Sequence, residues 1–228
     1  MGKMVAKSDA TRIRVNQRTE PRSDRVSGGG RGSTLCFIPE LWMRVGLMIS
    51  VSDLNTFWFS DPVRARWFNP TPEFDAMLRE NYLSLWESAR AGTLSDWEST
   101  PDGALALVIV LDQLPLNMFR GDPRSFATEA ASRAVAGRAV ARGFDQSLTP
   151  EQKSFLYMPY MHSEDLSDQN RSVALFEAAG LLRNLEFARH HREIVKRFAR
   201  FPHRNAILGR SSTPEEQAWL ATPDAFTG

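Results

Sequence analysis

The sequence predicts a single all-α domain, and three observations support this fold class. Beyond residue 50, Ser, Thr or Asp followed by proline or acidic residues repeatedly marks the start of a helix. Apolar residues after these starts recur at helical spacing, and no Asn-Gly or Asp-Gly turn separates two segments of alternating polarity. The 228 residues, 42% hydrophobic and 24% charged, are typical of a globular protein with a substantial core.

The first 47 residues differ from the remainder of the chain. They hold nine Lys or Arg against four Asp or Glu, whereas residues 48–228 hold 19 against 23. This segment is rich in Arg, Ser and Gly and has no apolar periodicity, so it cannot bury enough surface to offset the entropy of ordering. We expect residues 1–47 to be a disordered basic extension and residues 48–228 to form the helical domain. Met48, just before the first helical pattern, suggests a second interpretation, in which the extension comes from a misassigned start.

The first two helices are predicted from their caps and apolar faces. The serines of SVSDLNTFWF (residues 50–59) cap the first helix. The second begins with Thr71 as cap and Pro72 at the first helical position, and Gly92 ends it. The predicted inner faces consist of Leu54, Phe57 and Trp58 in the first helix and of Phe74, Met77, Leu78, Leu85 and Ala89 in the second.

The later helices include the most apolar segment of the chain, ALALVIVL (residues 104–111). By composition alone this segment fits a buried strand, but its start at Pro101 and its continuation to Phe119 favour a helix that is buried on all sides. Further helix starts of the same kind are Asp122-Pro123, Thr149-Pro150-Glu151 and Thr213-Pro214-Glu215.

Two polar residues interrupt this apolar helix. Asp112 lies on the face of the buried aliphatic residues, next to Gln113, so its charge must be paired or its pKa raised. Pro115 cannot donate a hydrogen bond to the carbonyl of Leu111, and we expect it to kink or end the helix.

Several function classes are excluded by composition and by missing motifs. The sequence has no Gly-rich phosphate loop, no His-Glu-x-x-His and no Gly-x-Ser-x-Gly. Its single cysteine, Cys36, excludes an internal disulfide and a multi-cysteine zinc site, which fits a reducing cytoplasm. A net charge of +1 gives no nucleic-acid footprint, and no stretch reaches the roughly 18 apolar residues that a membrane span needs. We therefore expect a cytoplasmic protein that binds neither nucleic acid nor membrane.

The segment YMPYMHSEDLSDQNRSVALF (residues 157–176) concentrates polar groups between apolar stretches, and it has two interpretations. In the functional one, a pocket for acid–base chemistry or metal binding consists of His162, Glu164, Asp168, His191 and His203. In the structural one, the segment joins two helices, with Ser163 or Ser167 as the cap. Asp168 would then be favoured by the helix dipole and would pair with Arg171. We expect His162 itself to lie at a helix start that is open to solvent.

Polar residues in apolar surroundings also mark the last third of the chain. His191 lies at helical spacing with Ile194 and Val195, on the inward face of its helix. The helix break at Pro202 is surrounded by Arg197, Arg200, His203, Arg204 and Asn205. The histidines lie far apart in sequence and lack the short spacing of zinc ligands, so we expect no bound metal.

Four blocks of the sequence resemble the signature blocks of a bacterial family, the domain of unknown function 924. They are FWFSD, DQLPLNMFRGDPRSFAT, MPYMHSEDLSDQNRSVALF and RFARFPHRNAILGRSSTPEE, in that order. The resemblance covers roughly residues 51–226 and implies a tetratricopeptide-like, superhelical all-α fold. It brings no established reaction, cofactor or substrate, and residues 1–47 lie outside it.

The family pattern is matched at many polar positions and departs at two. The matched positions include Asp112, Gln113, Pro115, Asn117, Arg120, Gly121, His162, Ser163, Glu164, Asp168, Gln169, Arg171, Ser172, His191, Arg197, Arg200, Phe201, Pro202, His203, Arg204 and Asn205. Leu116 stands where the family usually has an arginine, which removes a cation from the suspected site. Ala199 stands where the family usually has a glycine.

Two functions are predicted, with a purely structural polar network as a third interpretation. The first is a binding module that takes a small anionic ligand or a peptide in the concave surface of a helical array. Its candidate ligand-binding residues are Gln113, Asn117, Arg120, Asp168, Arg171, Arg200, His203, Arg204 and Asn205. The second is a hydrolase-type enzyme with His162 or His191 as general base and Glu164 or Asp112 as its partner. No cofactor is expected, and no feature indicates the oligomeric state.

Overall fold

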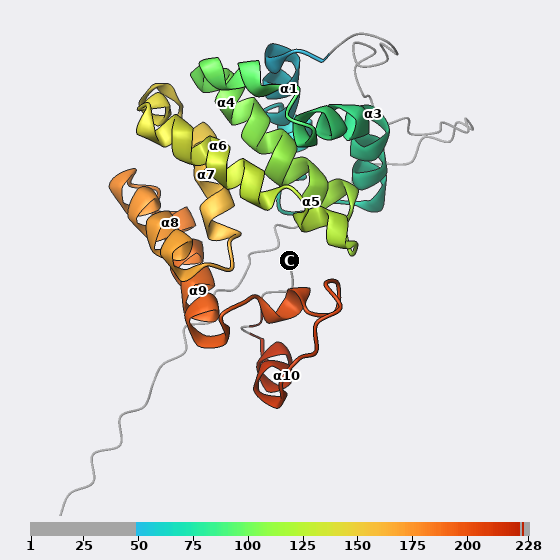
Figure 1. Cartoon of the computed structure of the whole chain (residues 1–228), viewed down its shortest axis with the longest axis vertical. Coiled ribbons are helices and arrows are strands. Elements are labelled where there is room, and N and C mark those ends of the chain that lie inside the picture. Colours follow the sequence, from blue (N-terminus) through green and yellow to red (C-terminus); the bar gives the residue numbers. More distant parts are fainter. Residues whose placement is uncertain (1–48, 224, 226–228) are drawn as a thin grey trace, which may run out of the picture. The chain divides into compact units, whose positions relative to one another are not determined.

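The computed structural model describes residues 49–223 and Ala225, and every regular element in this part of the chain is helical (Figure 1). The predicted all-α fold in a single domain is thereby confirmed. The extension predicted over residues 1–47 lies outside the described residues.

The described elements are α-helices joined by short helical turns. The α-helices are α1 (Val51–Trp58), α2 (Asp61–Arg64), α3 (Pro72–Arg90), α4 (Pro101–Val108), α5 (Leu114–Met118), α6 (Glu129–Ala141), α7 (Pro150–Met161), α8 (Leu166–Ala178), α9 (Leu182–Phe198) and α10 (Pro214–Leu220). The 3-10 turns are η2 (Ser95–Ser99), η4 (Pro123–Phe126), η5 (Phe144–Ser147) and η6 (Pro202–Arg204), and η3 (Ile109–Gln113) is a π-helical segment.

The predicted caps account for most helix starts. Thr71 accepts a hydrogen bond from the backbone amide of Phe74 and begins α3. Ser50, Thr149 and Thr213 each form a capping box, in which cap and third helical residue satisfy each other's backbone amides. These local devices fix where α1, α7 and α10 begin, and hence which side chains each helix directs inward.

The buried face of α3 differs from the predicted one. Phe74, Leu78 and Ala89 are buried as expected, but the aromatic residues Tyr82 and Trp86 take the places predicted for two aliphatic ones. The indole nitrogen of Trp86 donates a hydrogen bond to the hydroxyl of Thr128 at 3.1 Å. The ring centroids of Trp86 and the buried Phe119 are 4.8 Å apart. Large aromatic surface and a satisfied polar atom together decide the face.

The central helix of the fold runs through α4, η3 and α5 without a break in the chain, and α4 packs against α1, α6 and α7. Of the two outcomes expected at Pro115, a kink or an end of the helix, the end does not occur, because the π-helical segment before it changes the hydrogen-bond register. Pro115 has no amide hydrogen to donate to the carbonyl of Leu111. This carbonyl accepts a hydrogen bond from the hydroxyl of Thr128 instead. The helix therefore continues, and the π-helical segment carries Asp112 and Gln113.

The second half of the domain packs α8 against both α7 and α9. Gln169, fully buried, donates to the carbonyls of Met161 and Ser163 and so holds the α7–α8 turn. The start predicted at Asp122-Pro123 produces the short η4, and α6 begins later, at Glu129. No helix in residues 49–223 combines the length and the apolar character that a membrane crossing requires.

Candidate functional site

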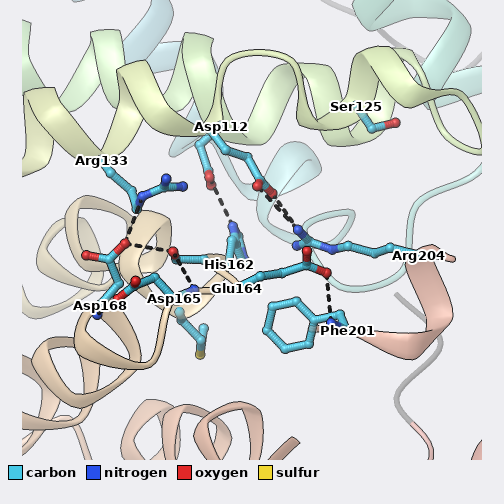
Figure 2. Close-up of polar contacts among 12 residues, drawn as sticks. Asp112, Ser125, Arg133, His162, Glu164, Asp165, Asp168, Phe201 and Arg204 are labelled. Carbon is cyan, nitrogen blue, oxygen red and sulfur yellow. Dashed lines mark hydrogen bonds and ion pairs between the residues drawn. The ribbon is translucent and has the colours of Figure 1, made fainter. Parts of the chain in front are cut away.

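The candidate site is centred on a histidine held by a buried carboxylate. Nδ1 of His162 lies 3.0 Å from Oδ1 of Asp112, whose side chain is fully buried (Figure 2). The side-chain amide of Gln113 donates to the other oxygen of Asp112. Since a carboxylate only accepts hydrogen bonds, Nδ1 carries the proton of the first contact. The prediction that the charge of Asp112 must be paired is met by His162.

The position of His162 corrects the solvent-open helix start expected for it. The residue caps the end of α7, and only 16% of its side chain is exposed. Asp112 comes from the π-helical segment of the neighbouring central helix, so the two groups are brought together by packing of α7 against that helix. Nε2 of His162 makes no hydrogen bond with any residue that the structure describes.

The electrostatics of the site favour the protonated imidazole. Burial lowers the pKa of His162, but the charge and hydrogen bond of Asp112, together with the charge of Glu129, outweigh it and leave the pKa above its ordinary value. Arg204 acts in the opposite direction. The ring can therefore take up and release a proton at a pH above the usual range for histidine.

A second ion pair lies beside the first and contains a residue that the sequence did not single out. Nη1 of Arg204 is 3.0 Å from Oε1 of Glu129, and both side chains are largely buried. The guanidinium of Arg204 is stacked between the rings of Phe126 and Phe201, 4.4 and 4.7 Å from their centroids. Burial raises the pKa of Glu129, and the nearby Arg204 opposes the change. The first acidic position of α6 resembled an ordinary solvated helix start, which explains why Glu129 was overlooked.

Glu164, a predicted partner of the general base, is engaged elsewhere. Its oxygens accept two hydrogen bonds from Arg210, at 2.6 and 2.8 Å. Figure 2 shows the third, which comes from the backbone amide of Phe201 at 2.8 Å. Burial raises the pKa of Glu164, but the hydrogen bonds from Arg210 and the Phe201 amide outweigh this effect. The pKa is therefore below its ordinary value, and the carboxylate stays charged. Glu164 therefore joins the α7–α8 turn to the segment after α9 and is not available to orient His162.

The residue that caps α8 is neither of the two predicted serines, Ser163 and Ser167. Asp165 caps α8 by accepting from the amides of Ser167 and Asp168. The predicted pair of Asp168 with Arg171 is also absent, since Asp168 pairs with Arg133 of α6 at 3.0 Å (Figure 2). Arg133 of α6 therefore takes the place predicted for Arg171 as the partner of Asp168.

These pairs form one network, which we call the His162 cluster. It comprises the carboxylates Asp112, Glu129, Glu164 and Asp168 and the basic side chains Arg133, His162, Arg204 and Arg210. With His162 protonated, four negative groups face four positive ones, so the cluster is neutral as a whole. An anion that binds here must displace a carboxylate from its partner.

The other predicted imidazoles behave differently from His162. Nδ1 of His191 donates to the carbonyl of Phe187 at 2.8 Å, and burial lowers its pKa to about 3. Burial and the charge of Arg204 lower the pKa of His203 to about 4. Both rings pack against Phe201. His191 and His203 are therefore neutral at physiological pH and contribute packing around the cluster.

A separate network, the α10 lock, holds two more of the predicted ligand-binding residues. Arg200 forms a bidentate pair with Glu216, with N–O distances of 2.6 and 2.8 Å. The amide of Asn205 donates to Ser212 and to Glu216. The bonds from Arg200 lower the pKa of Glu216 to about 2. The lock fixes α10 against the chain after α9.

Of the remaining predicted ligand-binding residues, Asn117 lies on α5, Arg120 follows α5 and Arg171 lies on α8. Asn117 donates to the carbonyl of Gln113 at 2.9 Å and accepts from Arg120 at 3.0 Å. Arg120 also pairs with Asp75 of α3 at 2.8 Å. Arg171 is exposed, with its guanidinium 4.8 Å from the ring centroid of Tyr160. Within residues 49–223, no three His, Cys, Asp or Glu side chains are grouped closely enough to hold a metal ion.

Comparisons with known proteins agree with the resemblance of the four blocks. A comparison with curated proteins gives no match. Among solved structures, the chain is similar to a protein of unknown function from Agrobacterium tumefaciens, with a TM-score of 0.71 and 37% sequence identity, over 75% of this chain and 96% of that one. Residues 54–224 match the family model described as bacterial protein of unknown function (DUF924). The chain belongs to this family.

Proposed function

We propose that the protein is a hydrolase-type enzyme in which His162 is the general acid–base group and Asp112 orients it. One observation carries the proposal: Nδ1 of His162 is held by a fully buried carboxylate, while Nε2 has no partner among the described residues. This is the arrangement in which a carboxylate fixes the tautomer of a catalytic imidazole and leaves the other nitrogen to exchange a proton with the substrate or with water.

Water is the nucleophile that this site favours. The hydroxyl of the adjacent residue, Ser163, donates to Asp168 at 2.7 Å and is committed to that bond. In its neutral form, His162 would accept a proton at Nε2 from a water molecule, and in its protonated form it would return the proton to a leaving group. Because the pKa of His162 is raised, the neutral form that acts as a base becomes the major form only at a pH above the ordinary value of 6.5.

The anion-binding module is the second candidate, and Arg171 is the observation that favours it. Its guanidinium is exposed, lies over Tyr160 and has no ion pair within the described residues. Arg120, Arg200 and Arg204 each already have a carboxylate partner, which weakens the case for an anion at those positions. A phosphate or carboxylate ligand would then use Arg171 beside the His162 cluster.

The test is hydrolysis of a panel of p-nitrophenyl substrates: an ester, an anilide, a phosphate monoester and diester, and a glycoside. We expect turnover of one class, with kcat/KM rising with pH through the pKa of His162. His162→Gln should lower kcat by about 100-fold or more. The control is His190→Gln, which changes an exposed histidine of α9 outside the cluster. No hydrolysis of any class, or unchanged turnover in His162→Gln, would count against the enzyme.

A second readout does not depend on knowing the substrate. Diethyl pyrocarbonate modifies accessible imidazole nitrogens, and mass spectrometry locates the product. We expect His162 to react and the more deeply buried His191 to stay unmodified. Protection of His162 by inorganic phosphate, lost in Arg171→Gln, would favour the anion-binding module instead.

A further inference from the structure

A cavity of about 210 Å³ lies away from the His162 cluster, between the end of α3, η2, α4 and α6. Its floor is formed by the buried side chains of Leu107, Leu111 and Val135. Ala131 and Ala134 of α6 also line it and are exposed. Because alanine side chains are short, they leave a hollow above these buried side chains, where larger side chains would fill the space.

The rim of the cavity carries three charged residues, of which two form an ion pair with each other and the third does not. Arg138 and Glu98 form a bidentate pair, with both N–O distances 2.7 Å, so their charges are mutually satisfied. Arg90 is exposed, lies 5.5 Å from the ring centroid of Trp86 and has no ion pair with any described residue. The cavity therefore has an apolar interior and one uncommitted positive charge at its edge.

We propose that this cavity binds a small carboxylic acid with a short apolar tail. The tail would cover Leu107, Leu111 and Val135, and the carboxylate would face Arg90, whose planar guanidinium matches its two oxygens. The volume is below the roughly 300 Å³ at which pockets for drug-sized molecules begin, which limits the ligand to a small molecule. A single cation over an apolar floor suits a monoanion better than a phosphate, and the prior commitment of Glu98 to Arg138 disfavours an amine.

The proposal does not depend on the enzymatic one. None of the residues that would contact the ligand belongs to the His162 cluster. Loss of carboxylate binding would leave the hydrolysis test unaffected, and absence of hydrolysis would leave carboxylate binding unaffected.

The experiment uses the full chain and three six-carbon probes: hexanoate, 1-hexanol and hexylamine. Binding is followed by thermal shift and by perturbation of the methyl resonances of Leu107 and Ala134 in NMR titrations. We expect hexanoate to raise the melting temperature in a saturable way, because a ligand of the folded state stabilises it by mass action. Hexanol should bind about tenfold or more weakly, since it lacks the charge-assisted contact, and hexylamine should not bind.

Two variants locate the ligand. Arg90→Gln should reduce hexanoate binding to the level of hexanol, whereas Arg183→Gln, which changes an exposed arginine of α9, should not alter it. Ala134→Met fills the cavity from an exposed helix position and should abolish the binding of both probes without unfolding the chain, as circular dichroism would verify. Equal affinity for hexanoate and hexanol, or full hexanoate binding by Arg90→Gln or Ala134→Met, would overturn the proposal.

Discussion

The His162 cluster and the α10 lock are both built from carboxylates and basic side chains, yet they use them differently. In the lock, Glu216 accepts from Arg200, Asn205 and the amide of Thr213, so the carboxylate is fully occupied in holding α10. In the cluster, the imidazole of His162 is fixed at one nitrogen and open at the other. Abundance of charge therefore does not distinguish a reactive site from a structural one. The distinction lies in whether a titratable atom is left without a partner.

The largest effect is expected from Asp112→Ala. This change removes the fully buried partner of His162 and leaves an imidazole and the amide of Gln113 without their acceptor. We expect unfolding by urea to show a loss of about 3–5 kcal/mol. Asp102→Ala, at an exposed position in the first turn of α4, should cost less than about 1 kcal/mol. Similar small losses in both variants would show that the Asp112–His162 pair does not contribute to the folded state.

Glu216→Gln should have the next largest effect and sharpens the comparison. Because Glu216 is almost completely buried and accepts from three groups, we expect a loss of about 2–3 kcal/mol. Its neighbour Glu215 is exposed, so Glu215→Gln should be nearly neutral. Catalytic turnover at a temperature where the variant is folded should not change. A loss of activity in folded Glu216→Gln would mean that the lock is part of the site.

The buried histidines should give opposite dependences of stability on pH. The folded-state pKa of His191 is lowered to about 3, so its contribution is complete above the ordinary value of 6.5 and is lost as the pH falls toward 3. The folded-state pKa of His162 is raised, so its contribution is complete below 6.5 and is lost as the pH rises through the folded value. In thermal unfolding from pH 4 to pH 9, His191→Gln should reduce the acid-side slope, to which His203 also contributes, and His162→Gln should reduce the alkaline-side slope. The opposite assignment of the two slopes would contradict the charge states described for the cluster.

The smallest change in the free energy of unfolding is expected at Ala199, the residue that ends α9. Ala199 adopts φ +56°, a left-handed conformation that a side chain disfavours and that suits glycine. Ala199→Gly should therefore raise the free energy of unfolding by about 1 kcal/mol. Ala91 at the end of α3 has φ −76°, and Ala91→Gly should lower it by about 0.5–1 kcal/mol. A destabilising Ala199→Gly would show that the left-handed turn is not strained.

The fold could be predicted from the sequence because its signals are local. Caps such as Thr71 and Thr149 and the apolar run of the central helix act over a few residues, and the structure places helices where they indicate. The apolar run predicted a helix that continues to Phe119, but how the helix passes Pro115 could not be predicted in this way. It depends on the hydroxyl of Thr128, a residue from a later part of the chain, which satisfies the carbonyl of Leu111.

The candidate site was only partly predictable for the same reason. Asp112 is recognisable as a charge in an apolar helix and His162 as a polar residue in an apolar segment, and the sequence predicted Asp112 as one of two possible partners for one of two histidines. It could not select the His162–Asp112 pair, which spans 50 residues. Glu129 carried no signal, since an acidic residue in the first turn of a helix is ordinary. Partner choice among charged residues is set by tertiary packing, which sequence spacing alone does not encode.

The ion pairs of the His162 cluster also impose an order on the folding of the chain during its synthesis. Glu129 lies 75 residues before Arg204, and Glu164 lies 46 residues before Arg210. At about 5–20 residues per second, the ribosome makes Glu129 roughly 4–15 seconds before its arginine exists. During that interval the carboxylate lacks the ion-pair partner that it has in the folded protein, so burying it is less favourable than in the complete chain. We therefore expect the nascent chain to keep α6 and the α7–α8 turn hydrated and loosely packed, and to close the core around them only after the segment following α9 has emerged.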